Sequence, residues 1–172
     1  MVSVEDAVIA RLKAHGQNFE ILVDCNNAIA LKNGKNIGLK DILATMKIYT
    51  DSKKGLVASE SAMKQAFGSS DTEEVARQII KKGEVQLTSE YRENLRELKR
   101  KQVINIIHRN GVDPRTHAPH PVQRIENALE EAKFHFDEFA SAEEQLQEAL
   151  KKLNPIIPIR FEVKEIAVKI GP

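Results

Sequence analysis

The feature that most constrains the fold is a pair of apolar stripes at helical spacing between residues 122 and 153. Apolar residues that recur every three or four positions lie on one face of a helix. The first stripe comprises Val122, Ile125, Leu129, Ala132, Phe136 and Phe139, and the second, after a Ser141-to-Glu144 capping-box pattern, comprises Ala142, Leu146, Leu150 and Leu153. A third stripe opens with Tyr91, Leu95 and Leu98 and widens into "VINII" at 103–107. Because such stripes can be buried only against one another, we predict a three-helix bundle over residues 88–157.

Residues 1–87 mix strand and helix signals. Alternating apolar residues at 8–12 and 19–23 flank Gly16, which predicts a β-hairpin. "SESAMKQAF" at 59–67 predicts a short helix, and "DTEEVARQIIKKG" predicts a longer one, with a capping-box pattern from Asp71 to Glu74 and a stop at Gly83. "EVQL" at 84–87 indicates a closing strand. This order predicts an N-terminal α/β domain whose sheet packs on helices.

The last residues alternate like a strand, "IPIRFEVKEIAVKIGP" at 157–172. The alternation changes phase near Lys164 and Glu165, which predicts a bulge or a break there. A strand this long has no predicted partner within the helical region, and exposed strand edges are normally covered. We therefore expect residues 158–172 to be the start of a truncated third domain, with Pro155 and Pro158 marking its boundary.

The composition excludes several classes of protein. Cys25 is the single cysteine, which rules out an internal disulfide and a multi-cysteine zinc site, and we interpret it as a small apolar filler. There is neither a signal-peptide pattern nor a long apolar run, so we expect a soluble cytoplasmic protein. The sequence also lacks a P-loop, an HExxH motif and a serine elbow. The sequence therefore offers no motif for catalysis, and we expect neither a metal nor a cofactor.

Charge is balanced over the chain, at a net +1, but uneven along it. Residues 88–111 carry six lysines and arginines against three glutamates, whereas residues 121–152 carry eight acidic residues against four basic ones. The basic residues include a stripe at helical spacing with a neighbour beside it: Arg92, Arg96, Lys99, Arg100 and Lys101. Two interpretations stay open, namely a solvated helix face paired with nearby glutamates and a row of phosphate contacts.

Weaker basic signals occur in the first region. Arg11 and Lys13 share one face of the predicted hairpin, and Lys53 and Lys54 lie in the loop "SKKG", where Gly55 lets the backbone approach a phosphate closely. The chain has only six Phe and two Tyr, most of them at core-like positions. If nucleic acid is bound, these residues predict recognition of backbone and shape rather than base stacking.

The segment "NGVDPRTHAPHP" at 110–121 holds residue types that zinc and general-base chemistry use. Its prolines prevent a regular helix, and Asp113 can accept amide hydrogen bonds from Arg115 and Thr116. Pro121 suits the first turn of the following helix. We interpret the segment as a structural corner rather than a metal site, with His117 and His120 at the surface, where they could form a contact.

Four stretches together resemble one known family. They are "AVIARLKAHGQNFEI" at 7–21, "KKGLVASESAMKQAFGSSD" at 53–71, "QIIKKGEVQL" at 78–87 and "VDPRTHAPHPVQRIENAL" at 112–129. Their order and spacing are similar to those of the Shwachman-Bodian-Diamond syndrome protein family of ribosome maturation factors, and the short N-terminus is more similar to the archaeal members. The resemblance implies an α+β multidomain fold, with an N-terminal α/β domain (1–87), a central three-helix domain (88–157) and the first strand of a ferredoxin-like third domain (158–172).

The resemblance also implies a function. Family members bind the RNA of the large ribosomal subunit and promote release of the anti-association factor together with a translocase-like GTPase, and they are not enzymes. For a monomer of this kind the nine basic residues above become candidate RNA contacts. Some eukaryotic members carry basic residues where this chain has His117, Ala118, Ser59 and Glu60, so contacts made there are not expected here.

Two other hypotheses belong to different classes of protein. The dipolar helical region is compatible with a protein-interaction adaptor in RNA processing, and a metal-dependent hydrolase centred on the corner would require bound metal in the purified protein.

Overall fold

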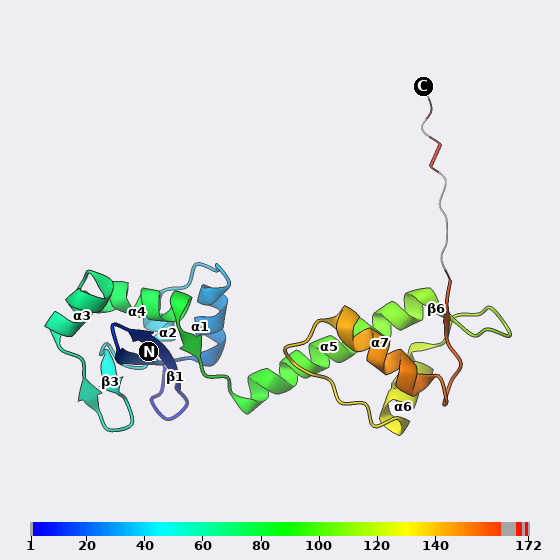
Figure 1. Ribbon diagram of the computed structural model, residues 1–172, viewed down its shortest axis with the longest axis horizontal. Helices are drawn as coiled ribbons and strands as arrows, with labels where there is room; N and C mark the ends of the chain where they lie inside the picture. Colours follow the sequence, from blue (N-terminus) through cyan, green and yellow to red (C-terminus); the bar gives the residue numbers. More distant parts are fainter. Residues whose placement is uncertain (1, 163–167, 170, 172) are drawn as a thin grey trace. The chain divides into compact units, whose positions relative to one another are not determined.

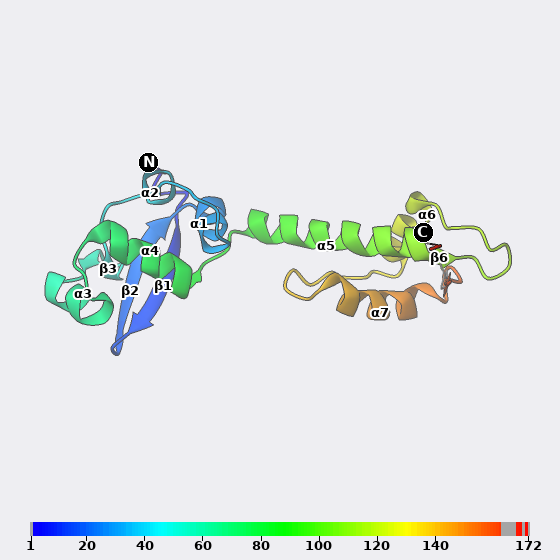
Figure 2. The same ribbon diagram turned by 90° about the horizontal axis from the view of Figure 1, so that it is seen from above.

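The computed structural model describes residues 2–162, 168, 169 and 171. The chain divides into two compact units, residues 1–91 and 92–172 (Figures 1 and 2). Helix α5 (Ser89–Asn110) starts in the last residues of the first unit and belongs mainly to the second. Among the described residues, no helix combines the length and the apolar character that crossing a membrane requires.

The first unit is built on a five-stranded sheet with the order β4-β3-β2-β1-β5. Its strands are β1 (Val8–Ala14), β2 (Gln17–Val23), β3 (Tyr49–Asp51), β4 (Leu56–Val57) and β5 (Glu84–Val85), and every pairing is antiparallel. The predicted hairpin is confirmed, since β1 and β2 pair from Ala14↔Gln17 outward. His15 and Gly16 form the turn with φ of 48° and 76°, the positive values that two-residue hairpin turns of this hand require.

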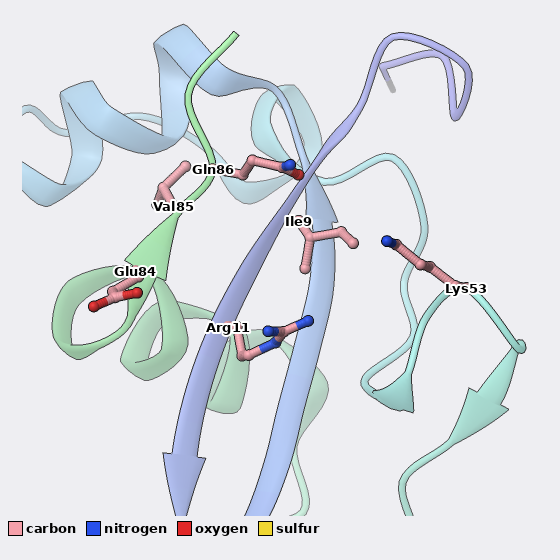
Figure 3. Close-up of a pocket in the computed structure, with 6 residues that line it drawn as sticks. All are labelled: Ile9, Arg11, Lys53, Glu84, Val85 and Gln86. Carbon is pink, nitrogen blue, oxygen red and sulfur yellow. The ribbon is translucent and has the colours of Figure 1, made fainter.

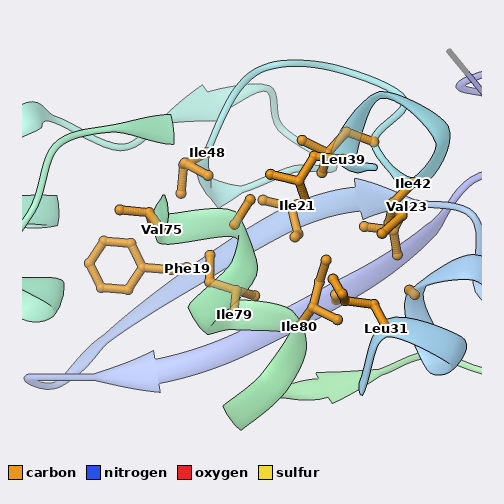
Figure 4. Close-up of a cluster of buried hydrophobic side chains, with 14 of the residues drawn as sticks. Phe19, Ile21, Val23, Leu31, Leu39, Ile42, Ile48, Val75, Ile79 and Ile80 are labelled. Carbon is orange, nitrogen blue, oxygen red and sulfur yellow. The ribbon is translucent and has the colours of Figure 1, made fainter. Parts of the chain in front are cut away.

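Helices cover one face of this sheet. They are α1 (Cys25–Lys32), α2 (Leu39–Ile42), α3 (Glu60–Phe67) and α4 (Thr72–Lys82), of which α3 and α4 were predicted. Asp71 caps α4 by accepting the amide of Glu74 at 3.0 Å. Figure 4 shows the side chains of β2 and α4 that meet in the core, Phe19, Ile21, Val23, Val75, Ile79 and Ile80.

The second unit contains the predicted helices α5, α6 (Val122–Glu131) and α7 (Ala142–Leu153). Each contributes a buried face to one cluster: Val103, Ile104 and Ile107 from α5, Ile125, Ala128 and Leu129 from α6, and Ala142, Leu146, Ala149 and Leu153 from α7. The capping box at the start of α7 is confirmed, because Ser141 and Glu144 each accept the other's amide through a side-chain oxygen.

Helix α6 is shorter than its apolar period predicted. Lys133, at φ 51°, closes it: the amide of Lys133 bonds the carbonyl of Glu130, and that of Phe134 bonds the carbonyl of Leu129. These two hydrogen bonds, together with a residue in the left-handed conformation, form a Schellman motif. The motif ends the helix even though apolar residues follow. The prediction that Phe136 and Phe139 lie on the α6 face is therefore wrong.

The C-terminal strand has a partner that the sequence did not predict. Strand β7 (Arg160–Phe161) pairs antiparallel with β6 (Gly111–Val112), the segment that follows α5. The expectation of no partner within the helical region is thus wrong for residues 160 and 161. Gly111 allows the two strands to approach each other closely, because a Cβ at this position would lie 2.9 Å from a methyl carbon of Ile159. The predicted break near Lys164 and Glu165 lies outside the described residues.

Candidate nucleic-acid interface

A buried carboxylate organises the basic residues of the first unit. Glu20, on β2, is only 4 % exposed, and its register partner across the hairpin is Arg11 on β1. One Glu20 oxygen accepts the Arg11 Nε and Nη2 groups at 2.7 and 2.6 Å. The other oxygen accepts the amide and the hydroxyl of Ser52 at 2.8 and 2.6 Å. Glu20 therefore ties the hairpin to the start of the 52–55 loop.

The same bonds keep Glu20 ionised. Burial opposes ionisation, but hydrogen bonds from the Ser52 hydroxyl and amide, together with the Arg11 guanidinium, hold the pKa of Glu20 below its usual value. A charged carboxylate binds its donors more strongly than a neutral one does. The loop that carries Lys53 and Lys54 is consequently anchored by a charge-assisted bond.

This arrangement brings Arg11 and Lys53 to one hollow of about 390 Å³. Ile9, Glu84, Val85 and Gln86 complete its lining. Figure 3 shows Lys53 extending from the β3–β4 loop toward β1, with its ammonium group beside Ile9. Two cationic side chains that lie 42 residues apart in the sequence thus face a common space that an anion of phosphate size could enter.

The other two candidates of this unit lie nearby in the sequence but differ in their contacts. Lys13 is exposed on β1 two residues after Arg11, on the same side of the strand. Lys54 pairs with Asp51 at 3.7 Å, and its amide bonds the same carboxylate at 3.1 Å. An exposed pair of this kind is weak, so Lys54 can still turn to an incoming phosphate.

In the second unit the stripe arginines are already paired. Arg92 bonds Glu138 through Nε at 2.7 Å and Nη2 at 2.6 Å, and Arg96 contacts the same carboxylate at 3.6 Å. The residue Glu138 is 9 % exposed. Its own amide and the Arg92 and Arg96 guanidinium groups keep its pKa below the usual value.

Further along α5, the pairs reach both within the helix and across to α6. Arg96 also bonds Glu93 at 2.6 Å, and Arg100 contacts Glu97 at 3.8 Å and Glu130 at 3.3 Å. Within the described part of the chain, Lys99 and Lys101 have no ion pair. The pairing with glutamates one turn away, one of the two open interpretations of the stripe, is thus present, and these contacts leave phosphate binding by the stripe untested.

Sequence reasoning missed the two carboxylates that hold these groups. Glu20 could have been found, because counting outward from the Gly16 turn places it opposite Arg11. Glu138 gave no such signal, since the apolar period had assigned its neighbours to α6.

The corner at 110–121 forms the turn that Asp113 and Pro121 predicted. Asp113 accepts the amides of Arg115 at 2.8 Å and Thr116 at 3.4 Å, and these bonds keep its pKa below the usual value. Pro121 is the N-cap of α6, just before its first turn. No group of three or more His, Cys, Asp or Glu residues suited to a metal ion occurs among the described residues.

The prediction that His120 lies at the surface is wrong. His120 is 1 % exposed and its Nε2 lies 2.8 Å from the carbonyl oxygen of Pro158, while its own carbonyl accepts His108 Nδ1 at 2.8 Å. His117, in contrast, is exposed and contacts Glu162 at 3.1 Å. The corner uses His120 to join the end of α5 to the segment after α7.

Comparison with known proteins matches both units. Residues 6–93 match the Shwachman-Bodian-Diamond syndrome (SBDS) N-terminal domain, and residues 101–162 match domain II of the SBDS protein. The chain is 43% identical over 171 residues to the "Ribosome maturation protein SDO1 homolog" of Methanothermobacter thermautotrophicus, covering 99% of this chain and 74% of the relative.

Two further relatives align over most of the chain as well. The homolog of the same name from Aeropyrum pernix is 44% identical over 168 residues, which are 98% of this chain and 72% of the relative. The human "Ribosome maturation protein SBDS" is 28% identical over 152 residues, which are 88% of this chain and 61% of the relative.

Proposed function

The chain belongs to the Shwachman-Bodian-Diamond syndrome protein family, and from this premise we propose that it is a ribosome maturation factor. It binds the large ribosomal subunit through ribosomal RNA and promotes release of the anti-association factor. Relatives named ribosome maturation proteins support the general role. The specific contacts are argued below from the residues of this chain.

One observation supports the RNA contact more than any other, namely the set of bonds from Glu20 to Arg11 and Ser52, which we call the Glu20 clamp. It holds Arg11 and the loop of Lys53 in place before any ligand arrives. A preorganised cation loses little conformational entropy on binding, and each phosphate contact releases counterions. We propose that the hollow lined by Arg11 and Lys53 receives a backbone phosphate, with Lys13 and Lys54 at neighbouring phosphates.

The energy for releasing the anti-association factor comes from a partner in this proposal. The sequence has no P-loop, and following the family resemblance we assign hydrolysis to a translocase-like GTPase and the role of a non-enzymatic cytoplasmic binding partner to this chain. Its part is to occupy the subunit and to bias the conformation of that GTPase.

The test is binding to purified large ribosomal subunits over a salt series. We expect the affinity to fall steeply as salt rises, with a logarithmic slope of roughly 0.7 to 0.9 per phosphate contacted. The double variant Lys53→Glu/Lys54→Glu weakens binding, whereas Lys35→Glu/Lys40→Glu, with the same charge change at two other exposed lysines, does not. Affinity independent of salt would remove the phosphate contacts from the proposal.

A second candidate function is supported by the paired stripe. Arg92, Arg96 and Arg100 contact carboxylates, as Arg11 does in the first unit, and residues 121–152 add eight acidic residues to four basic ones in the same unit. A protein-interaction adaptor in RNA processing would fit that surface. Nuclease treatment separates the two: an adaptor keeps its isolated partners after ribosomal RNA is digested, and a factor held by RNA loses them.

A further inference from the structure

Phe139 is the most exposed aromatic residue among those the structure describes. The residue is 68 % exposed, although Phe134 and Phe136, close by in the sequence, pack their rings edge to face at 4.8 Å between centroids. An apolar side chain of this size is normally buried, and aromatic residues left in water often anchor a partner. The loop that carries Phe139 is held by specific bonds of the neighbouring residues.

The residue before Phe139 is fixed by charge. Glu138 is buried and holds the guanidinium groups of Arg92 and Arg96. The charged side chain of Glu138 is therefore turned to α5, whereas the apolar side chain of Phe139 is exposed to solvent. The Arg92–Glu138 pair thus anchors the loop to α5 directly before Phe139.

The backbone on both sides of Phe139 is also fixed. Gln145, 5 % exposed on α7, accepts the amide of Asp137 at 2.8 Å and donates to the carbonyls of Asp137 and Ala140 at 2.9 and 3.1 Å. The Asp137 carboxylate accepts the amide of Phe139 at 2.8 Å. Since the loop is ordered by these bonds, a partner of Phe139 does not have to order it again.

The charge around Phe139 identifies the kind of partner. Residues 137–144 read "DEFASAEE", in which Glu138 is buried and paired with Arg92 and Arg96, while the other three carboxylates, of Asp137, Glu143 and Glu144, belong to exposed residues. Such a stretch repels phosphates and attracts a surface rich in lysine and arginine. A ribosome offers RNA and proteins, and the proteins that lie against its RNA must be basic to neutralise the phosphates. The acidic stretch therefore favours a protein.

We propose that Phe139 anchors a docking site for a basic ribosomal protein of the large subunit, with the phenyl ring in an apolar pocket and the exposed carboxylates of Asp137, Glu143 and Glu144 against its lysines and arginines. This inference rests on the proposed function and adds to it a contact with protein, made by the second unit, beside the RNA contact of the first unit.

The test compares binding of the whole chain and its variants to purified large ribosomal subunits. Phe139→Ala weakens binding by about tenfold or more, the effect of truncating an aromatic anchor. Val122→Ala removes another exposed apolar side chain of the same unit, 42 % exposed, and leaves binding unchanged. Melting curves of both variants establish that they fold. If the parent chain binds and Phe139→Ala binds equally well, this inference fails and the proposed function stands; if the parent chain does not bind, the proposed function fails first.

Two further measurements distinguish protein from RNA as the partner. Glu143→Lys, at an exposed position of the acidic stretch, weakens binding to a basic protein but strengthens binding to RNA. A photoreactive p-benzoylphenylalanine placed at position 139 and irradiated on the subunit gives a product that protease digests and ribonuclease does not. A crosslink to ribosomal RNA, or tighter binding of Glu143→Lys, overturns the inference.

Discussion

Arg11 and Glu20 face each other across the β1–β2 hairpin, and their side chains are joined through two guanidinium nitrogens at 2.6 and 2.7 Å. The second oxygen of the same carboxylate holds Ser52. A single side chain thus positions basic groups from a strand and from a loop, which makes its removal informative for both stability and binding.

Replacing Glu20 by Ala is expected to destabilise the first unit. The buried carboxylate disappears, and the Ser52 amide loses its acceptor, which costs about 1 to 3 kcal/mol of unfolding free energy. Urea denaturation measures the loss. Glu84→Ala is the control, because Glu84 is Arg11's exposed partner on β5 and has no ion pair among the described residues. Equal effects of the two changes would mean that the clamp contributes nothing.

The stabilisation from Glu20 depends on pH in a direction that its pKa fixes. Because the folded-state pKa is lowered, the stabilisation is complete above the unfolded pKa of about 4.3 and is lost as pH falls through the lower folded value. The difference in urea midpoint between the parent chain and Glu20→Gln is therefore largest near pH 7 and shrinks below about pH 4. A difference that grew on acidification would contradict the assignment.

Gly83 is expected not to tolerate a side chain. Its φ is negative, so the constraint is space alone: a Cβ would overlap the carbonyl oxygen of Arg11 and lie 2.5 Å from that of Ile79. Gly83→Ala should cost about 1 to 3 kcal/mol by forcing α4 away from β1. The matched change Gly38→Ala meets only a side-chain oxygen of Asp41, at 3.4 Å, and should cost less in thermal unfolding.

His120→Leu is expected to destabilise the second unit although it fills similar space. The substitution leaves the Pro158 carbonyl without its donor in a site that is almost closed to water, at a cost of about 1 to 3 kcal/mol. Thermal unfolding measures this loss. His117→Leu, at an exposed position of the same corner, should lower the stability much less in that measurement. Similar losses from both would show that burial of His120 does not matter.

The sequence predicted the elements whose signals are local. The hairpin, α3, α4 and α7 follow from alternation, caps and helical period, all within a few residues of one another. Helices α1 and α2 were not predicted, because the polar and apolar residues of "CNNAIALK" do not separate onto two helix faces and "LKDI" spans barely one turn.

The misses arose where contacts that the apolar pattern does not encode decided the outcome, one of them local and the others distant in the sequence. The apolar period continued to Phe139, yet the backbone bonds at Lys133 ended α6 earlier. His120 looked like a surface residue until the Pro158 carbonyl, 38 residues away, supplied its partner. Among the candidate RNA contacts, the register of the hairpin could have paired Arg11 with Glu20, but the partner of Arg92 lies 46 residues further on.

Within the second unit, helix α5 is held by two different kinds of interaction. Around Arg92, Arg96 and Arg100 it is bound by ion pairs to Glu138 and Glu130, whereas around Ile104 and Ile107 it is bound by apolar packing. Dissolved salt weakens the first kind, more at the exposed Glu130 than at the buried Glu138, and does not screen the second. One continuous helix should therefore have a salt-sensitive half and a salt-resistant half, a difference that amide hydrogen exchange would record along its length.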